Sequence, residues 1–372
     1  MKLLIQPGDG VERLLKGIRK AKKSIEILIF RFDRPEVERA LADAVERGVF
    51  VHALIAFTNR GGEANLRKLE KRLLADGITV ARTAGDLVRY HGKMMIVDHK
   101  ELYLMAFNLT YLDIDRSRSF AVITRNPTLV TEAEKLFEAD TKRQDYSAGS
   151  NRFLVSPVNA RNELARFIKG AKKELLIYDL KVSDRAMLRL IDDRQEAGVE
   201  IRLLGCVPSR QIRASELKRM RLHTRTIIRD RRDAFIGSQS LRQVELDARR
   251  EIGIIFRDGR AVKELVRTFE EDWAASASTQ FEKEDHREEE HEQHRETLQG
   301  QKIVKRVAKS VAKKVKITPV AKKVAKAISK TADVNLSGRK VQKSVEEIVE
   351  DVVESTALDA AKEAVKVVAD AS

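Results

Sequence analysis

The chain contains an internal repeat, and this repeat limits the possible folds to those with two similar halves. The run IRKAKKSIEI at residues 18–27 matches IKGAKKELLI at residues 168–177, an offset of 150 positions. The same offset relates GVFV at 48–51 to GVEI at 198–201. A duplication of this length within 372 residues indicates two domains of one design, each large enough to bury a core.

Both halves show the same order of predicted elements, in which a basic turn leads into a strand, a helix and a second strand. The predicted elements are strands at 25–31 and 174–180, helices at 34–47 and 183–197, and strands at 49–57 and 199–206. Strands that alternate with helices of this length predict α/β units with a largely parallel sheet.

Each half then carries a histidine motif at an equivalent place. A histidine is followed by a cation two residues later and by an aspartate five residues beyond the cation: His91, Lys93 and Asp98 in the first half, and His223, Arg225 and Asp230 in the second. The motifs are 132 positions apart, so a connection in the second half is 18 residues shorter. One such motif can arise by chance in a chain rich in lysine, but duplication at equivalent places argues against chance.

The residue types at this spacing suit phosphoryl transfer. Side chains two apart on a strand share a face, so His91 and Lys93 point the same way. Asp98 follows at the end of the predicted strand, where a carboxylate can accept the imidazole proton and fix the ring. A neutral imidazole beside a cation can attack phosphorus while the cation neutralises the phosphoryl oxygens. Two facing sets would supply a nucleophile and a general acid.

With these motifs, the sequence resembles the phospholipase D superfamily from residue 1 to about 276. The resemblance implies an α/β fold with a duplicated phospholipase D-like domain, in which helices flank two similar mixed-sheet lobes. It also implies a covalent phosphohistidine on one histidine and protonation of the leaving alcohol by the other. Water or a second alcohol then releases the phosphoryl group, and neither a metal nor a cofactor is expected. We expect a first lobe at 1–148 and a second at 149–276.

The two halves depart from the family pattern in different places. The first half keeps Asn108, but it has Met105-Ala106 and Arg118-Ser119 where Gly-Ser and Arg-Glu are usual. The second half keeps Gly-Ser at 237–238 and Arg-Glu at 250–251, but it has arginine for lysine at 225 and Ser240 for asparagine. These departures leave two interpretations open. One is an active site in which the two halves have different roles, and the other is a binding protein with weak catalysis.

If the site is active, the retained Lys93 makes His91 the preferred nucleophile and His223 the general acid, although the reverse order remains open. We expect Asp98 and Asp230 to orient the imidazoles. The cations Lys93 and Arg225 would neutralise phosphoryl oxygens. The residues expected to bind substrate are Asn108, Ser238, Ser240 and Glu251. Four other histidines, His99, His286, His291 and His294, are interpreted as solvated, and no metal site is predicted.

The positive net charge of residues 1–280 favours an anionic partner. Residues 1–280 hold 53 basic and 40 acidic residues, so this segment carries about +13 of the net charge of +15. A phosphodiester substrate fits this charge, with phospholipid favoured and nucleic acid as the alternative. Aromatic residues make up only 5% of the chain, which disfavours a stacking platform for single strands.

The composition also restricts where the protein is expected. A single cysteine, Cys206, excludes an intramolecular disulfide and fits a reducing compartment. The apolar run at the N-terminus is shorter than a signal peptide requires, and no stretch is long enough for a membrane span. We therefore expect a cytoplasmic protein, or one at the periphery of a membrane.

The composition changes after about residue 276. Residues 277–300 are predicted to be a charged linker, and 301–372 a helical tail that is first basic and then acidic. Residues 301–330 hold 11 lysines and arginines and no acid, with a Val/Ile stripe at every fourth position. This segment is expected to contact an anionic membrane or nucleic acid. The alternative is self-association with the acidic apolar segment at 341–368.

Overall fold

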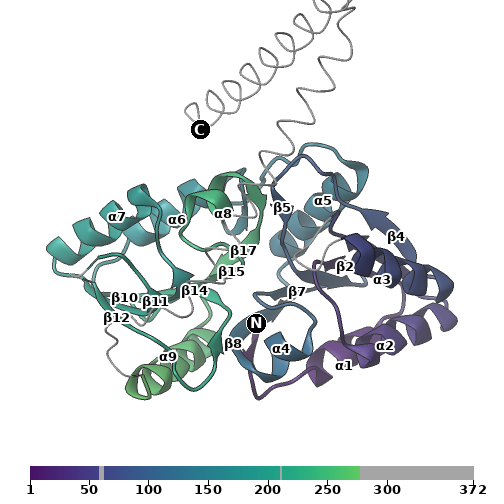
Figure 1. Ribbon diagram of the computed structural model, residues 1–372, viewed down its shortest axis with the longest axis horizontal. Coiled ribbons are helices and arrows are strands. Elements are labelled where there is room, and N and C mark those ends of the chain that lie inside the picture. The colour runs from purple at the N-terminus through teal and green to yellow at the C-terminus, as the bar shows by residue number, and fades with distance from the viewer. Residues whose placement is uncertain (58–62, 210–211, 277–372) are drawn as a thin grey trace, which may run out of the picture. The chain divides into compact units, whose positions relative to one another are not determined.

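The protein is represented by a computed structural model, which describes residues 1–57, 63–209 and 212–276. The repeat forms two α/β lobes within one compact unit, Met1–Phe281, as the sequence predicts (Figure 1). The predicted linker at 277–300 and the tail segments at 301–330 and 341–368 lie outside the described residues.

The first lobe begins with a strand that precedes the repeat and then follows the predicted order. Its elements are β1 (Lys2–Gln6), α1 (Glu12–Lys20), β2 (Ser24–Ile29), α2 (Pro35–Glu46), β3 (Phe50–Ile55), α3 (Glu63–Ala75), β4 (Thr79–Arg82), β5 (Arg89–Tyr90), β6 (Met94–Val97), β7 (Glu101–Met105), α4 (Tyr111–Asp115), β8 (Ser117–Thr124) and α5 (Pro127–Lys142).

The second lobe repeats this design with a shorter connection before its histidine motif. Its elements are β9 (Phe153–Val155), α6 (Ala160–Lys169), β10 (Glu174–Lys181), α7 (Arg185–Glu196), β11 (Glu200–Cys206), β12 (Arg213–Ser215), β13 (Arg221–Leu222), β14 (Arg225–Arg229), β15 (Asp233–Gly237), α8 (Gln243–Asp247), β16 (Arg249–Arg250), β17 (Ile252–Phe256) and α9 (Gly259–Ala274). The predicted strands and helices of both halves are present, with ends shifted by one or two residues.

Both sheets are mixed, as the family resemblance implies. The first has the order β1-β8-β7-β6-β2-β3-β4, and the second has the order β12-β11-β10-β14-β15-β17-β9. The expectation of a largely parallel sheet is wrong for those strands of the first sheet that follow His91. Strands β2, β3 and β4 are parallel, whereas β6, β7, β8 and β1 are each antiparallel to their neighbours in this order, and only the short β13 adds a parallel pair at β8 among the described residues. The reason is that β6 and β7 join through a tight turn, which reverses the chain without a crossover helix.

The two lobes share a hydrophobic core. One continuous cluster includes Leu28 and Met94 from the first sheet and Leu176 and Tyr178 from the second. Separate clusters lie under α1, α2 and α3 in the first lobe and under α6 and α7 in the second. Figure 1 shows α1, α2 and α3 on the outer side of the first lobe and α7 on the outer side of the second. The sheets therefore meet at a shared core that also takes in residues of α5 and α9, such as Leu136 and Phe269, and other helices cover the opposite face of each sheet.

Polar contacts also join the lobes across this core. Arg118 of β8 forms a bidentate ion pair with Asp272 of α9, with distances of 2.7 and 2.9 Å. The same carboxylate accepts a hydrogen bond from the Tyr178 hydroxyl at 2.7 Å.

In the part of the chain that the structure describes, no helix combines the length and the hydropathy of a membrane span.

The aspartate of each histidine motif fastens a turn of its own lobe. The Asp98 carboxylate accepts hydrogen bonds of 2.6–3.1 Å from the backbone N–H groups of Lys22, Lys23 and Ser24. Asp230 does the same for residues 172–174 at 2.7–3.1 Å. Although partial desolvation opposes the shift, these donors lower the pKa of Asp98.

The prediction that Asp98 and Asp230 orient the imidazoles is therefore wrong. The four residues of β6 separate Asp98 from the cation Lys93. At a rise of about 3.3 Å per residue, the aspartate and the histidine lie at opposite ends of the strand, roughly 13 Å or more apart. The spacing of the motif reflects the length of a strand that begins at the site and ends at a structural turn.

Replacing Asp98 by alanine is expected to lower the free energy of unfolding by about 1–3 kcal/mol, because three backbone donors lose their acceptor. Asp98→Asn should cost much less, since its side-chain oxygen still accepts and asparagine tolerates the φ of 55° at this position. Denaturant unfolding measures both effects. Turnover per folded molecule should stay near the wild-type value in both variants, and its loss in Asp98→Asn would contradict the structural role.

Candidate active site

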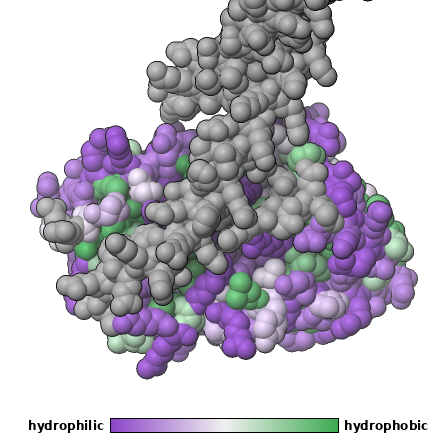
Figure 2. All heavy atoms as spheres, in the orientation of Figure 1, coloured by the Kyte–Doolittle hydropathy of each residue, from purple (hydrophilic) through white to green (hydrophobic). Residues whose placement is uncertain are grey.

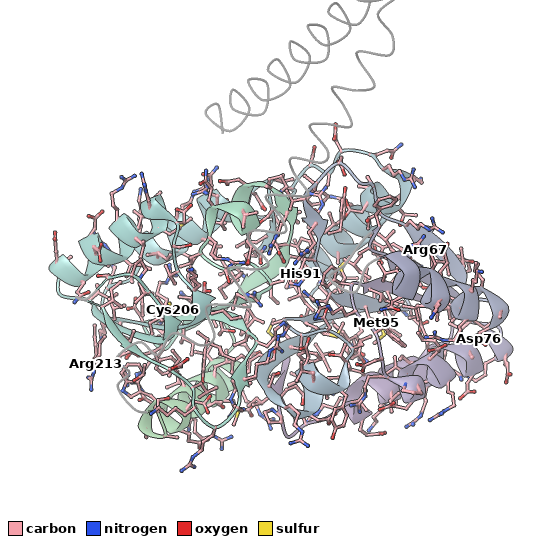
Figure 3. All side chains as sticks on the ribbon, in the orientation of Figure 1. Arg67, Asp76, His91, Met95, Cys206 and Arg213 are labelled. Carbon is pink, nitrogen blue, oxygen red and sulfur yellow. The ribbon has the colours of Figure 1, made fainter. Side chains whose placement is uncertain are left out.

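The two histidines lie where the lobes meet, and each is held by the opposite lobe. The backbone N–H of His91 donates to the carbonyl oxygen of Arg250 at 2.8 Å, and that of His223 donates to the carbonyl oxygen of Arg118 at 3.0 Å. The two acceptors are 132 positions apart, as are the two histidines. Figure 3 shows His91 at the boundary between the lobes. The fold therefore brings both predicted motifs to one site.

His91 is oriented by a carboxylate from the second lobe. Its Nδ1 lies 2.9 and 3.1 Å from the two carboxylate oxygens of Glu251, which is fully buried. Burial and the nearby Lys93 and Arg225 hold the pKa of His91 well below its usual range. Burial and the nearby Glu245 raise the pKa of Glu251 to about 7, and once Glu251 is ionised, a neutral ring that donates its Nδ1–H to it presents an unprotonated Nε2. Glu251 thus positions the imidazole, and its predicted contact with substrate stays a prediction.

His223 has a partner that the sequence analysis missed. Its Nδ1 lies 3.4 Å from Oδ2 of Asp113 in α4. Burial opposes ionisation of Asp113, but the charge of Arg221 and two hydrogen bonds from Asn108 favour the carboxylate and lower its pKa. Burial also holds the pKa of His223 well below its usual range, despite the charge of Asp113. This histidine is therefore buried and neutral beside an ionised carboxylate.

The two carboxylates come from positions that do not correspond in the repeat. The counterpart of Glu251 in the first lobe is Ser119, whose hydroxyl donates to the His223 carbonyl oxygen at 2.7 Å. The counterpart of Asp113 in the second lobe is Glu245. The departure noted in the first half is thus offset by an acid from the short helix α4. An acid five residues after Asn108, and again five after Ser240, was the signal that could have revealed it.

The two polar residues that follow the motifs each donate to the acid five positions later, and Ser240 also contacts the cation Arg225. Both the backbone N–H and Nδ2 of Asn108 donate to Asp113, at 2.8 and 2.7 Å. Ser240 donates its backbone N–H to Glu245 at 2.6 Å, and its hydroxyl accepts from Nε of Arg225 at 3.0 Å. Their predicted contact with substrate stays a prediction. The Oδ1 atom of Asn108 is buried without a hydrogen-bond partner.

Ser238 has its hydroxyl engaged by the sheet. The hydroxyl donates to the carbonyl oxygen of Ile252 at 3.3 Å and accepts from its N–H at 3.1 Å. The side chain is fully buried. A substrate contact at Ser238 therefore also stays a prediction.

The cations of both motifs are buried near the histidines. Lys93 is 2% exposed and donates from Nζ to the His91 carbonyl oxygen at 2.6 Å. Burial is the main cause that lowers its pKa to about 7, although Glu251 partly opposes the shift. Arg225 is 7% exposed, and its Nη1 is buried without a hydrogen-bond partner. A buried guanidinium with an unused donor favours an anion in the site.

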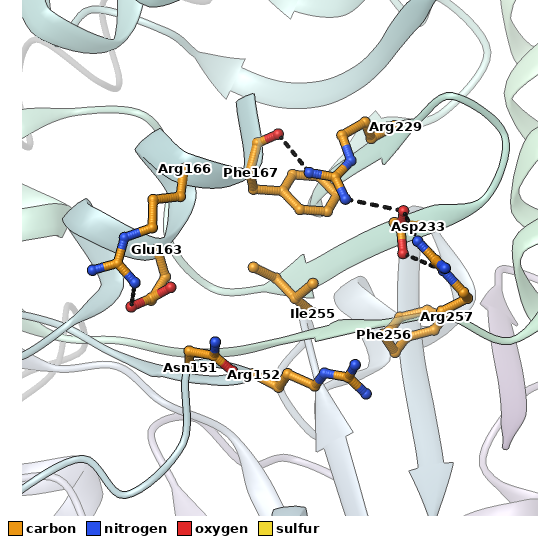
Figure 4. A pocket seen from close by; sticks show the side chains of 10 residues that line it. All are labelled: Asn151, Arg152, Glu163, Arg166, Phe167, Arg229, Asp233, Ile255, Phe256 and Arg257. Carbon is orange, nitrogen blue, oxygen red and sulfur yellow. Dashed lines mark hydrogen bonds and ion pairs between the residues drawn. The ribbon is translucent and has the colours of Figure 1, made fainter. Parts of the chain in front are cut away.

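Two other features of the described residues lie away from this site. Glu26, His99 and Glu134 could hold a metal ion, but they lie by the Asp98 turn at the far end of β6. His99, interpreted as solvated, contacts Glu134 at 2.9 Å and Ser24 at 3.1 Å. An open cavity of about 340 Å³ lies by the far ends of β14 and β17 (Figure 4).

Three of the four arginines that line this cavity, Arg166, Arg229 and Arg257, are paired with acids of its wall. Arg229 and Arg257 both pair with Asp233, and Arg166 pairs with Glu163. No residue of either histidine motif lines it. We therefore keep the two-histidine site as the candidate active site.

Comparison with known proteins identifies the family. A family model described as "Cardiolipin synthase, PLD-like domain" matches residues 14–141 and 164–273, more than half of the chain and both histidine motifs. The chain belongs to the phospholipase D-like family. Members of this superfamily are phosphodiesterases that act as hydrolases or transferases.

Individual relatives are similar over parts of their length. The mitochondrial cardiolipin hydrolase of Danio rerio is 30% identical over 131 residues, which are 34% of this chain and 56% of that protein. The chain therefore spans little more than half the length of this relative.

Two solved structures share the fold over most of this phospholipase D-like chain. Polyphosphate kinase from Porphyromonas gingivalis matches with a TM-score of 0.62 and 20% identity, over 73% of this chain and 50% of that one. Phosphatidylserine synthase from Haemophilus influenzae Rd KW20 matches with a TM-score of 0.54 and 11% identity, over 70% and 83%. At these identities the likeness shows the two-lobed fold.

The depressed pKa of Lys93 predicts a basic limb in the pH profile. Lys93 loses its proton as pH rises through about 7, so kcat/KM, which reports the free enzyme, should fall above that pH. Arginine stays charged throughout this range, so Lys93→Arg should keep its remaining activity to higher pH. Lys100→Arg, on the exposed turn beside Asp98, is the matched control and should keep the wild-type profile. An unchanged basic limb in Lys93→Arg would contradict this assignment.

Proposed function

We propose that this chain is a phosphodiesterase of the phospholipase D type that forms a covalent phosphohistidine on His91. The observation that carries the proposal is the reciprocal pairing of His91 with Glu251 and of His223 with Asp113 across the lobe boundary. Two buried imidazoles, each beside a carboxylate, suit a nucleophile and a general acid. The cations Lys93 and Arg225 lie beside them.

In the first step, Nε2 of His91 attacks phosphorus and the bond from phosphorus to the leaving oxygen breaks. The imidazolium of His223 gives its proton to that oxygen. Burial keeps His223 neutral in the free protein, so this role depends on the anionic diester, whose charge favours the imidazolium together with Asp113. Lys93 and Arg225 neutralise the charge that develops on the phosphoryl oxygens.

In the second step, neutral His223 accepts a proton from water or from an alcohol. The resulting oxygen nucleophile attacks phosphorus, and the bond between phosphorus and Nε2 of His91 breaks. The products are a phosphomonoester or a new diester and the starting form of His91. Glu251 stabilises the positive charge on the phosphorylated ring through Nδ1–H. These steps use only residues of the chain, and no metal or cofactor is part of the proposal.

Phospholipid is the proposed substrate class. The family model carries the name of cardiolipin synthase, and the relative from Danio rerio is a cardiolipin hydrolase. The fold is shared with a phosphatidylserine synthase. The basic charge of residues 1–280 also fits nucleic acid, so a nuclease of the same family is the alternative.

Turnover of bis(p-nitrophenyl) phosphate in EDTA tests the reaction with wild type, His91→Ala and His223→Ala. We expect metal-independent turnover in wild type and a loss of about 10³-fold or more in each variant, because each removes a reacting group. His99→Ala, a histidine outside the site, is the matched control and should keep full activity. Turnover that persists in His91→Ala would contradict the proposed nucleophile. Phospholipid vesicles and oligonucleotides, compared as substrates, then separate the lipid enzyme from the nuclease.

A further inference from the structure

Exposed hydrophobic side chains are unevenly distributed over the described residues. Seven large ones are more than a third exposed: Phe50, Phe57, Leu74, Val88, Tyr111, Leu112 and Val158. Five of these lie in loops or in α4 at the end of the sheets where the two histidines are. Phe50 and Leu74 are the exceptions.

The strand directions define these two ends of each sheet. Residue 94 starts β6 at the site and pairs with residue 28 near the end of β2, so β2 and its parallel neighbour β3 run toward the site. Phe57 follows the end of β3. The backbone N–H of Val88 donates to the carbonyl oxygen of Ala248, beside β16. In the second lobe, Val158 follows residue 156, whose N–H bonds to the Glu251 carbonyl oxygen. Five apolar side chains thus share the end of the sheets that carries the site.

Tyr111 and Leu112 lie closest to the chemistry. They are 56% and 49% exposed in α4, and the next residue, Asp113, is the carboxylate that contacts His223. The backbone N–H of Tyr111 donates to Asp33 at 2.7 Å, which fixes the start of the helix. Figure 2 shows exposed hydrophobic atoms where α4 lies in Figure 1. These two side chains are therefore exposed directly beside the residue that contacts His223.

Cations surround this apolar pair. The guanidinium carbons of Arg34 and Arg116 lie 5.9 and 6.0 Å from the centroid of the Tyr111 ring. Arg34 pairs with Glu36 and Asp115, whereas Arg116 is exposed and forms no ion pair with an acidic side chain of the described residues. A tyrosine and a leucine among arginines match a surface that is apolar inside and anionic outside.

The same positions in the second lobe lack this character. The counterparts of Tyr111 and Leu112 are Gln243 and Val244, at the start of α8. A nucleobase could stack on a tyrosine, but an exposed leucine and three further aliphatic or phenyl side chains gain nothing from a phosphate backbone. The composition of this face favours a lipid surface over a nucleic acid.

We propose that this face, defined by Phe57, Val88, Tyr111, Leu112 and Val158, is a contact surface for an anionic phospholipid bilayer. Tyr111 and Leu112 enter the boundary between headgroups and acyl chains, and Arg116 contacts headgroup phosphates. The inference rests on the proposed function, because a bilayer on this face would present its lipid diesters to the two histidines. It is independent of the tail segment at 301–330.

A tryptophan placed at position 111 in the full-length chain reports on this contact locally. Trp273→Phe removes the single native tryptophan, and Tyr111→Trp adds the reporter. With vesicles of phosphatidylcholine and phosphatidylglycerol, its emission should shift to the blue and be quenched by brominated acyl chains. Pure phosphatidylcholine should give a weaker response. An unshifted, unquenched emission would overturn the proposal, even if the chain binds the vesicles through another segment.

Activity provides the second test. Tyr111→Gln combined with Leu112→Gln should lower turnover of vesicle-bound phospholipid by about tenfold or more, since two apolar side chains lose their burial. Turnover of bis(p-nitrophenyl) phosphate should stay within about twofold of wild type. Leu74→Gln, equally exposed at the opposite end of the sheet, is the matched control and should change neither.

The outcomes separate this inference from the proposed function. Equal losses on both substrates would mean that the α4 variant damages the site, and an unchanged rate on vesicles would mean that the face does not dock; either result overturns the inference. Absence of wild-type turnover on both substrates would instead count against the proposed function. The fluorescence of the reporter at position 111 would still decide the membrane contact.

Discussion

Each imidazole of the site is held by the lobe to which it does not belong. Glu251 of the second lobe orients His91, and Asp113 of the first lobe lies beside His223. Backbone hydrogen bonds also hold each histidine to the opposite lobe, from His91 to Arg250 and from His223 to Arg118. The site therefore exists only where the lobes pack, and the shared core and the Arg118–Asp272 ion pair maintain that packing. One lobe alone carries a histidine and a cation without the acid that positions the ring.

The two halves differ in residues, but the site as a whole contains two histidines, two cations and a carboxylate beside each histidine. Where the second lobe has Glu251, the first has Ser119, and Asp113 supplies the missing carboxylate from α4 instead. Where the first lobe has Lys93, the second has Arg225, whose longer fork reaches Ser240. The two cations then differ physically, because burial can discharge a lysine near neutral pH but not an arginine. This asymmetry fits a reaction in which the two histidines have different roles.

The sequence predicted the duplicated mixed α/β fold because the repeat carries both the apolar periodicity and the basic turns of each half. It also predicted that His91, Lys93, His223 and Arg225 come together. It failed for Asp98 and Asp230, because a motif records spacing along a strand and not which end of the strand lies at the site. Asp113 was missed because its importance comes from a contact across the lobes, which local periodicity does not contain.

The most direct test of the account is to identify the phosphorylated residue. The enzyme would be stopped in alkali during turnover of a phosphodiester, digested, and examined by mass spectrometry for a phosphoryl group on histidine. The account predicts the added mass on the peptide that contains His91. A phosphoryl group found on the peptide that contains His223 and not on that of His91, or none on either during demonstrated turnover, would contradict it.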